Sequence, residues 1–255
     1  MKKLVSLLLA GIMAASMIVG CANATKADKF VVGVDDGFAP MGFRDEANEI
    51  VGFDIDLAKE AGKRMGKEVV IQPIEWSQKV LELNNDKIDV IWNGFTITEE
   101  RKQEVLFTKP YLKNNQIIVV AADSDIAVKA DLAGREVGLQ SGSSAMDALT
   151  ADPINEQIKA CSEYENNVYA LNDLKIGRVE AVIVDEVVGK YYVAKEPESF
   201  KVLDESLAAE EYGIGVKMGN TELLEELQKA IDEMIADGTA AEISTKWFGE
   251  DIVLK

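Results

Sequence analysis

Short apolar runs rich in β-branched residues alternate along the chain with segments whose apolar residues recur at helical spacing. The runs at 30–34, 69–73 and 88–93 predict buried strands, and the segments at 54–65 and 77–83 predict helices. Strands that alternate with helices in this order are typical of parallel-rich sheets covered by helices. The pattern therefore predicts an α/β fold.

Two segments, 83–91 and 174–182, share a pattern that indicates the arrangement of this fold. Each contains a leucine, a basic residue, a β-branched residue and an acid before an apolar strand. The first strand leads to Asn93 and the second to Asp185, so equivalent strand ends carry polar groups. Two similar lobes explain this, although helix–turn–strand units also look alike in unrelated folds. Ligands of open α/β sheets bind beyond the carboxyl ends of strands, so we expect a cleft between the lobes.

The first residues have the pattern of a secretion signal. Lys2 and Lys3 precede an apolar run at 4–19, and Cys21 follows closely. The run is shorter than the roughly 20 residues that a membrane-spanning helix needs, and no later segment supplies one. We therefore expect a signal peptide at 1–20 and a soluble mature protein.

The cysteine after this run resembles the lipid-carrying residue of bacterial lipoproteins. The box Ile18-Val19-Gly20-Cys21 departs from the usual pattern, which has Leu where Ile18 stands and a small residue at Val19. An ordinary secretory signal cut nearer Ala24, with Cys21 removed, is the alternative. The first interpretation makes Cys21 a lipid anchor, 21–28 a flexible tether, and the location extracytoplasmic, on the cell membrane or in the periplasm.

Charge and cysteine content narrow the classes of partner. Without Lys2 and Lys3, 25 basic residues face 45 acidic ones, so the net charge is −20. Such a chain is repelled by nucleic acid and by anionic lipid, so attachment to a membrane would depend on the lipid anchor. If Cys21 carries lipid, only Cys161 remains and no internal disulfide can form. The sequence does not indicate whether Cys161 is buried.

The chain lacks histidine, which argues against catalysis. The commonest general base and the commonest metal ligand are therefore missing, so we expect no enzyme, metal or cofactor. Carboxylate pairs such as Asp35 with Asp36 are better explained as ligand contacts or surface charge. No phosphate-binding loop occurs, so an ATPase that acts with this protein must be another chain.

The region from Lys29 to Gly249 resembles the polar amino-acid-binding proteins of bacterial ABC importers, solute-binding family 3, which have the type II periplasmic-binding-protein fold. The motifs that carry the resemblance, in order, are Phe38-Ala39-Pro40-Met41-Gly42-Phe43, Val51-Gly52-Phe53-Asp54-Ile55-Asp56-Leu57, Thr96-Ile97-Thr98-Glu99-Glu100-Arg101, Val137-Gly138-Leu139-Gln140-Ser141-Gly142-Ser143, Tyr212-Gly213-Ile214 and Asp237-Gly238-Thr239. The resemblance implies two mixed sheets flanked by helices and a two-strand hinge. An amino-acid importer with its permease and ATPase is the implied partner, and we expect a monomer.

The resemblance also implies the boundaries of the parts. Lobe 1 would be discontinuous, formed by 29–113 and 214–255, and lobe 2 would be formed by 119–209. The hinge segments would be 114–118 and 210–213.

The resemblance places ligand contacts on both lobes. The planar fork of Arg101, with Thr96 and Gly94, is expected to hold the ligand's carboxylate. From the other lobe, the serines of a helix start, Ser143 and Ser144, would close on that carboxylate, and Asp185 would hold the ammonium. Gln140, just before this turn, is expected to be a further ligand contact. Each position also has an ordinary explanation: a solvated arginine, a helix cap and a turn aspartate.

Four further residues are expected around the ligand's side chain. Phe38 and Trp76 match positions whose rings flank the ligand in relatives, and Asp35 matches an acid at its far end, with Asn93 beside the same pocket. Two aromatic rings and a carboxylate suit a guanidinium or ammonium, which favours arginine, lysine or ornithine. Glutamine, histidine and cystine remain alternatives, because Asp35 can also accept an amide or imidazole N–H.

Two other functions fit the same residues. A sensor that docks on a receptor would have the same site chemistry, and genes for a permease and an ATPase beside this one would argue for transport. A dehydratase-like enzyme on the same fold is the remaining alternative, because fold does not fix function.

Overall fold

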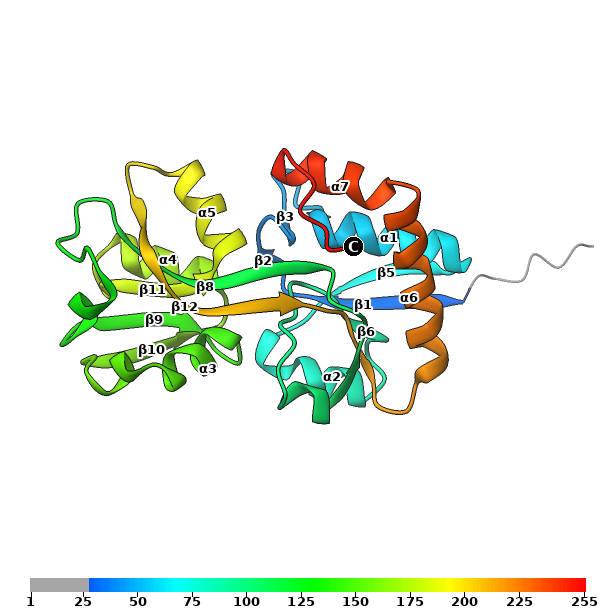
Figure 1. The fold of residues 1–255 in the computed structure, drawn as a ribbon, viewed down its shortest axis with the longest axis horizontal. Helices are drawn as coiled ribbons and strands as arrows, with labels where there is room; N and C mark the ends of the chain where they lie inside the picture. The colour runs from blue at the N-terminus through cyan, green and yellow to red at the C-terminus, as the bar shows by residue number, and fades with distance from the viewer. Residues whose placement is uncertain (1–27) are drawn as a thin grey trace, which may run out of the picture.

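The computed structural model describes residues 28–255 (Figure 1). The signal peptide expected at 1–20, Cys21 and nearly all of the tether lie outside the described residues. Within 28–255 no helix combines the length and the apolar run that crossing a membrane requires. The described chain forms two lobes, which lie side by side along the long axis of the molecule.

Lobe 1 is built on a five-stranded mixed sheet in the order β5-β1-β6-β13-β7. β1 pairs in parallel with β5 and β6, and β13 pairs antiparallel with β6 and β7. Its strands are β1 (Lys29–Val34), β5 (Glu68–Pro73), β6 (Val90–Ile91), β7 (Val105–Phe107) and β13 (Gly215–Lys217). Chain segments from both ends of the sequence therefore meet in one sheet.

Helices and a small hairpin sheet complete lobe 1. The helices are α1 (Phe53–Met65), α2 (Lys79–Asn84), α6 (Thr221–Ala236) and α7 (Thr239–Phe248). The hairpin sheet contains β2 (Gly37–Phe38), β3 (Gly42–Arg44) and β4 (Ile50–Val51). Two single 3-10 turns, η1 (Trp76–Gln78) and η2 (Arg101–Gln103), flank the strand β6 in the sequence.

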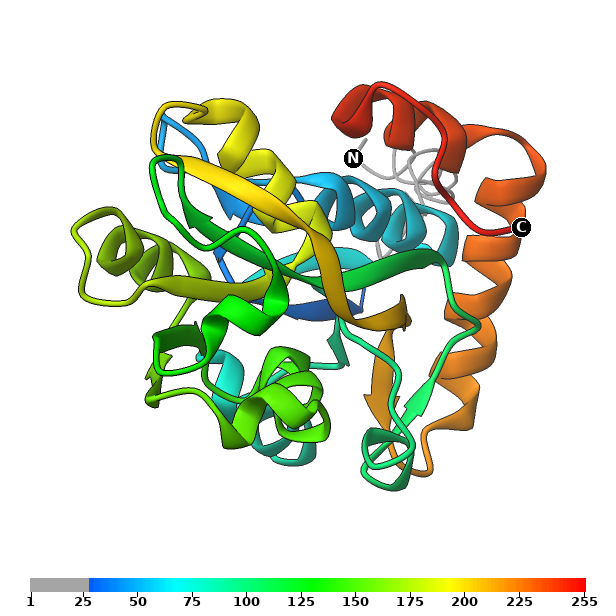
Figure 2. The same ribbon diagram turned by 60° about the vertical axis from the view of Figure 1, so that its left-hand side comes forward.

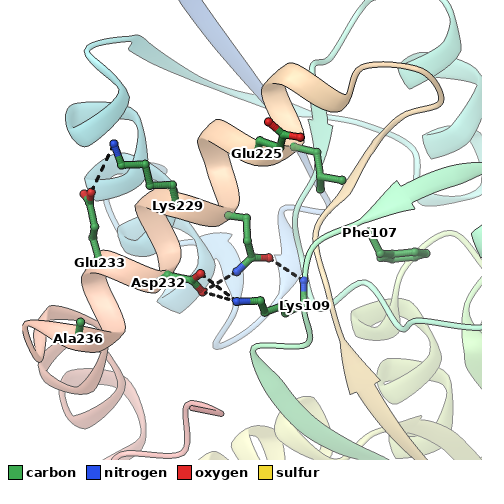
Figure 3. A pocket seen from close by; sticks show the side chains of 9 residues that line it. Phe107, Lys109, Glu225, Lys229, Asp232, Glu233 and Ala236 are labelled. Atoms are coloured by element: carbon green, nitrogen blue, oxygen red, sulfur yellow. Dashed lines mark hydrogen bonds and ion pairs between the residues drawn. The ribbon is translucent and has the colours of Figure 1, made fainter.

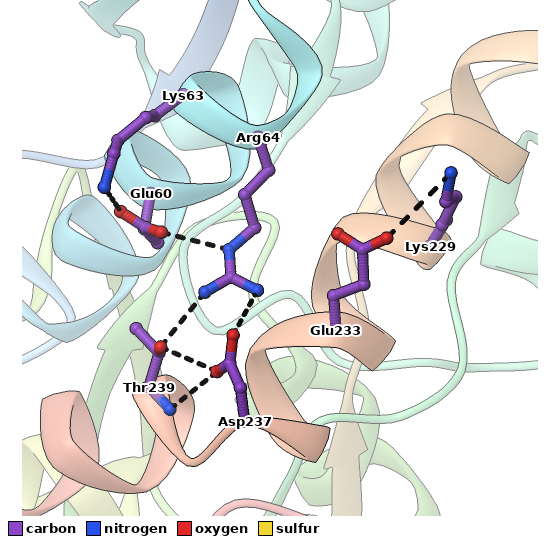
Figure 4. Close-up of polar contacts among 7 residues, drawn as sticks. All are labelled: Glu60, Lys63, Arg64, Lys229, Glu233, Asp237 and Thr239. Carbon is purple, nitrogen blue, oxygen red and sulfur yellow. Dashed lines mark hydrogen bonds and ion pairs between the residues drawn. The ribbon is translucent and has the colours of Figure 1, made fainter.

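The C-terminal helices are tied to α1 by one arginine (Figure 4). Arg64 contacts Glu60 on its own helix at 3.0 Å and Asp237 at the end of α6 at 2.8 Å. Its Nη2 also donates to Thr239 Oγ1 at 3.0 Å, at the start of α7. These contacts attach α6 and α7 to the N-terminal part of lobe 1.

Lobe 2 repeats the same sheet arrangement, in the order β10-β9-β11-β8-β12. Its parallel strands are β9 (Glu136–Gln140), β10 (Ala160–Tyr164) and β11 (Ala181–Asp185). Its helices are α3 (Ser144–Ala151), α4 (Asn167–Lys175), α5 (Glu186–Lys195) and the 3-10 turns η3 (Lys129–Leu132) and η4 (Pro153–Glu156). The mixed sheets and flanking helices confirm the α/β class predicted from the apolar pattern.

Two long antiparallel strands connect the lobes (Figures 1 and 2). They are β8 (Leu112–Ala121) and β12 (Phe200–Tyr212), and they are joined in register from Phe200↔Ala121 to Tyr212↔Leu112 with irregularities near Ser206. At the lobe 1 end, Tyr212 also forms a bridge with Thr96. The pair forms the expected two-strand connection, while the residue limits of the hinge stay a prediction.

Two local predictions differ in detail from the structure. The helix expected at 77–83 begins as the turn η1 and becomes α-helical only at Lys79. The strand expected at 88–93 is assigned only at β6, although Asp89 N and Trp92 N still donate to carbonyls of β1. The apolar pattern therefore located both elements correctly but did not mark where regular geometry ends.

Candidate functional site

The polar residues predicted for the site lie where the two lobes meet. Asp35 follows β1 and Asn93 follows β6 in lobe 1, while Gln140 and Asp185 end β9 and β11 in lobe 2. Hydrogen bonds cross from one lobe to the other, from Gln140 Nε2 to Asp35 Oδ2 at 2.6 Å and between Thr96 Oγ1 and Ser144 Oγ at 3.0 Å. The carboxyl ends of the strands thus face one cleft, in which the lobes contact each other directly.

Arg101 supplies a buried positive charge on the lobe 1 side. Its guanidinium donates to Thr96 O at 3.0 Å and, across the cleft, to Gly142 O at 3.3 Å. The group also lies 4.9 Å from the centre of the Phe95 ring. Only 8% of Arg101 is exposed, and burial lowers the pKa of its guanidinium. Within residues 28–255 it makes no ion pair with a carboxylate.

Asp185 supplies a buried carboxylate on the lobe 2 side. It stands between β11 and the start of α5, yet its side chain makes no capping bond to that helix. Instead Oδ1 accepts hydrogen bonds from Tyr212 Oη at 2.6 Å and Asn114 Nδ2 at 2.8 Å. Burial, and then the neighbouring charge of Glu210, raise the pKa of Asp185 to about 7. The sequence indicated this residue but none of its three neighbours.

Gln140 and Asp35 form a buried bridge between the lobes. Asp35 also accepts from Gly37 N at 2.8 Å, and Gln140 Oε1 accepts from Asn167 Nδ2 at 3.2 Å. Burial raises the pKa of Asp35 to about 6. Ser143 donates from Oγ to Gln140 O at 2.7 Å, so its hydroxyl fixes the turn that leads into α3.

The loop after β6 brings Gly94 against Phe38 and Asn93 against Gly42. Gly94 has a φ of 57°, and a Cβ there would lie 2.7 Å from Phe38 Cε1, so a larger residue would collide with the ring. Gly94 N donates to the buried carboxylate of Asp54 at 2.8 Å. Asn93 is 1% exposed, and neither of its side-chain polar atoms has a hydrogen-bond partner among residues 28–255. The loop is therefore rigid and carries an amide with free hydrogen-bonding capacity.

Trp76 lies at the cleft but is already packed on both sides. Its ring meets Phe95 edge-on, with centroids 5.8 Å apart, and Lys79 Nζ lies 5.1 Å from its centre. Lys79 Nζ also donates to Gly142 O at 2.8 Å. Burial, and then the charge of Arg101, lower the pKa of Lys79 to about 7. No sequence pattern indicated this contact, because a lysine in an amphipathic helix is normally solvated.

Glu210 is another residue that sequence reasoning missed. It lies on β12, within the predicted hinge segment 210–213, and its Oε2 accepts from Thr96 Oγ1 at 3.0 Å. Oε2 also accepts from Ser144 Oγ at 3.3 Å. The site therefore brings the cation Arg101 of lobe 1 together with two neighbouring carboxylates, Asp185 of lobe 2 and Glu210 of the connecting strand β12.

A separate groove of about 600 Å³ lies on the outer face of lobe 1, between β7 and α6 (Figure 3). Four of its charged side chains form pairs, Lys109 with Asp232 at 2.9 Å and Lys229 with Glu233 at 3.9 Å. Gln228 accepts from the backbone N of Lys109 and donates to Asp232. Within residues 28–255 no cluster of three potential metal ligands occurs. The cleft is thus the place where unpaired polar groups gather, and the groove is not.

Comparisons with known proteins agree with this geometry. Residues 30–250 match the model of the family described as bacterial extracellular solute-binding proteins, family 3. The L-cystine-binding protein TcyJ of Escherichia coli K12 is 28% identical over 257 residues, which cover 96% of each chain. The histidine-binding periplasmic protein of Salmonella typhimurium LT2 is 33% identical over 251 residues, which cover 93% of this chain and 96% of the relative.

A solved structure extends the agreement to the whole fold. The structure of an ancestral arginine-binding protein bound to arginine superposes with a TM-score of 0.83, at 41% identity, over 88% of this chain and all of the other. This confirms the periplasmic-binding-protein fold that the sequence motifs implied. The chain belongs to family 3 of the bacterial extracellular solute-binding proteins.

Proposed function

We propose that this protein captures a free polar L-amino acid by closure of its lobes and delivers it to the permease of an ABC importer. The observation that carries the proposal is the placement of a buried arginine, Arg101, and a buried aspartate, Asp185, on opposite lobes of one cleft. An amino acid is a zwitterion, so it needs both charges at a short separation. The two relatives bind cystine and histidine, and the solved neighbour binds arginine.

The carboxylate end of the ligand belongs with Arg101. A guanidinium offers two parallel N–H groups that match a carboxylate, and burial strengthens such a contact. Arg101 at present spends two of its donors on the carbonyls of Thr96 and Gly142. The hydroxyls of Thr96 and Ser144 lie near it, 3.0 Å apart, and both contact Glu210 Oε2.

The ammonium end belongs with Asp185. Two neutral donors, Tyr212 and Asn114, hold its carboxylate in place. A buried carboxylate with only neutral partners is destabilised, so a cationic group that binds beside it gains a strong interaction.

Three residues around the side-chain end favour a cationic amino acid. Asp35 provides a carboxylate and Phe38 an aromatic ring, which together suit the guanidinium of arginine or the amine of lysine or ornithine. Trp76 should contribute less to binding of a cationic side chain than its position in the sequence implies, because Lys79 Nζ lies 5.1 Å from the centre of its ring. Glutamine, histidine and cystine are the alternatives, since Asp35 accepts a hydrogen bond from a neutral amide here.

Calorimetric titration with the twenty amino acids, ornithine and cystine tests the function. We expect tight binding of at least one polar amino acid, and no binding by any of them would refute the proposal. Asp35→Asn then tests the side-chain preference: arginine, lysine and ornithine should weaken far more than glutamine. Equal losses for all ligands would contradict a cationic preference. Asp123→Asn, the same change at an exposed position, is the control.

The lipid anchor at Cys21 and the monomeric state complete the proposal. In the native host, Cys21→Ser should release the protein from the membrane fraction and abolish labelling with a radioactive fatty acid. Unchanged fractionation and no label in the wild type would favour the ordinary secretory signal. Light scattering on the mature chain should give the mass of one copy.

A further inference from the structure

One carboxylate oxygen in the hinge accepts hydrogen bonds from four side chains. Oε2 of Glu210 receives Thr96 Oγ1 at 3.0 Å, Gln116 Nε2 at 3.0 Å, Asn114 Nδ2 at 3.1 Å and Ser144 Oγ at 3.3 Å. Hydrogen bonds to an ionised acceptor are roughly twice as strong as neutral ones. Glu210 is therefore the centre of a charged network and not a solvated strand residue.

The four donors come from parts of the molecule that separate when the lobes open. Thr96 belongs to the loop after β6 in lobe 1, and Ser144 begins α3 in lobe 2. Asn114 and Gln116 lie on β8, opposite Glu210 in the strand pair that joins the lobes. Separation of the lobes moves Thr96 away from Ser144, so a wide opening removes at least one of these hydroxyls from Glu210.

The same network brings two carboxylates together. Asn114 Nδ2 donates both to Glu210 Oε2 and, at 2.8 Å, to Asp185 Oδ1, so the two acids are neighbours. Like charges in a buried site repel each other, and the repulsion from Glu210 contributes to the raised pKa of Asp185, about 7. Arg101 and Tyr212 are the other ionisable groups that act on Asp185 here.

The amides that hold Glu210 carry a further cost. Because Asn114 Nδ2 and Gln116 Nε2 face the carboxylate, their oxygens face away, and neither Oδ1 nor Oε1 has a partner among residues 28–255. A buried unpaired acceptor costs roughly 1–3 kcal/mol. An arrangement that leaves two acceptors unpaired and two acids adjacent is not optimal for stability, which is typical of sites that serve a ligand.

We propose that Glu210 is a second anionic group of the ammonium subsite and that it couples capture of the ligand to closure of the lobes. The inference rests on the proposed function. A cation bound beside Asp185 offsets the negative charge of both acids, while the hydroxyls of Thr96 and Ser144 stay gathered on Glu210. A ligand without an ammonium leaves the two acids uncompensated, so the closed cleft rejects it.

Glu210→Gln tests the charge specifically, because the glutamine oxygen can still accept hydrogen bonds. The probe is the amino acid from the panel that the wild type binds most tightly, together with the matching carboxylic acid that lacks the amine. We expect Glu210→Gln to bind the amino acid about 10- to 100-fold more weakly and to discriminate less between the two probes. Small-angle scattering should show a smaller decrease in radius of gyration on ligand addition.

Two variants control the experiment. Glu211→Gln removes the same charge from the next residue, whose side chain is exposed, and should bind as the wild type does. Glu210→Asp keeps the charge and should retain part of the affinity. Equal affinities of Glu210→Gln and Glu211→Gln for the amino acid would overturn the proposal. So would a Glu210→Gln variant that binds both probes more weakly by the same factor. Equal losses of affinity in Glu210→Gln and Glu210→Asp would also overturn it. If the wild type binds no amino acid, the proposed function itself fails and this inference fails with it.

Discussion

The two lobes have the same sheet and differ in the connection after the strand at its centre. Orders β5-β1-β6-β13-β7 and β10-β9-β11-β8-β12 match strand for strand, including the direction of every pairing. After β6, a loop with Gly94 in the left-handed region leads to Arg101 at the start of η2. After β11, the chain enters α5 at once, and Asp185 stands at the junction.

This contrast explains how one architecture supplies opposite charges to one ligand. The loop of lobe 1 is long enough to fold a guanidinium back onto the carbonyl of Thr96, whereas the abrupt strand-to-helix junction of lobe 2 leaves a short carboxylate at the strand end. The arginine of the cleft therefore comes from a connection after a strand, and the aspartate from the last residue of a strand. Substitutions that change one lobe at a time should separate the contribution of the lobe 1 guanidinium to binding from that of the lobe 2 carboxylate.

The largest effect should come from the cation of lobe 1. Arg101→Ala removes the only charge we assign to the ligand's carboxylate, so affinity should fall at least about 100-fold, or ~3 kcal/mol. Calorimetry with the best amino acid measures the loss, and circular dichroism checks the fold. Arg178→Ala, at a largely exposed arginine of lobe 2, should change nothing. Unchanged affinity for Arg101→Ala would remove Arg101 from the site.

The sequence predicted much of this comparison because it depends on local patterns. The similar segments 83–91 and 174–182 became the equivalent connections into β6 and β11. Arg101 and Asp185 were found because they follow those strands at positions that match the family. The structure places both in the cleft, while their contact with a ligand stays a prediction.

Glu210 and Lys79 could not be predicted in the same way. Each is a charged residue among other charged residues, and only the register of β12 against β8, or the approach of the Gly142 turn, buries its charged end. Trp76 was expected beside the ligand's side chain; the structure places Lys79 Nζ near its ring, and its contact with a ligand stays a prediction. Contacts between lobes depend on long-range geometry that no local pattern records.

A second effect, on stability and its pH dependence, separates the two buried aspartates. Burial raises the pKa of both Asp54 in lobe 1 and Asp185 in lobe 2 to about 7, from 3.8 in the unfolded chain. Between these values the folded state binds more protons, so stability falls as pH rises from about 4 to 7. Asp54→Asn should flatten this fall by about 2–4 kcal/mol in urea unfolding of the ligand-free protein.

Ligand binding distinguishes the lobes in the same pH series. Gly94 and Tyr111 of its own lobe enclose Asp54, so Asp54→Asn should leave the pH dependence of affinity unchanged. Asp185 must ionise to hold an ammonium, so wild-type affinity should rise from pH 5 to 7. Asp185→Asn should reduce this rise, and the part that remains should come from Asp35, whose pKa is about 6. If Asp54→Asn and Asp185→Asn both reduced the pH dependence of affinity by the same amount, the assignment of Asp185 to the ammonium would be contradicted. The measurements stop at pH 7. Above this pH Lys79, whose pKa is lowered to about 7, loses its positive charge, which should change the affinity in the opposite direction.

The smallest effect should come from an aromatic contact between the lobes, away from the polar site. Tyr191 on α5 packs against Phe43 on β3 with ring centroids 5.8 Å apart, and Phe43 packs edge-on against Trp247 on α7 at 5.9 Å. An aromatic pair contributes about 0.5–1.5 kcal/mol beyond its buried area. Tyr191→Ala should therefore weaken binding by about 2- to 10-fold, mainly through faster dissociation in stopped-flow measurements.

The control for this contact is Tyr169→Ala, at a tyrosine of α4 in lobe 2 that is 51% exposed. Because Tyr191 meets lobe 1 only when the lobes are closed, its loss should act on closure and leave amino-acid selectivity unchanged. Changed selectivity would mean that α5 shapes the pocket itself. Equal dissociation rates for the two variants would mean that closure depends on the polar groups alone, with the charges of Arg101, Asp185 and Glu210 sufficient to hold the lobes together.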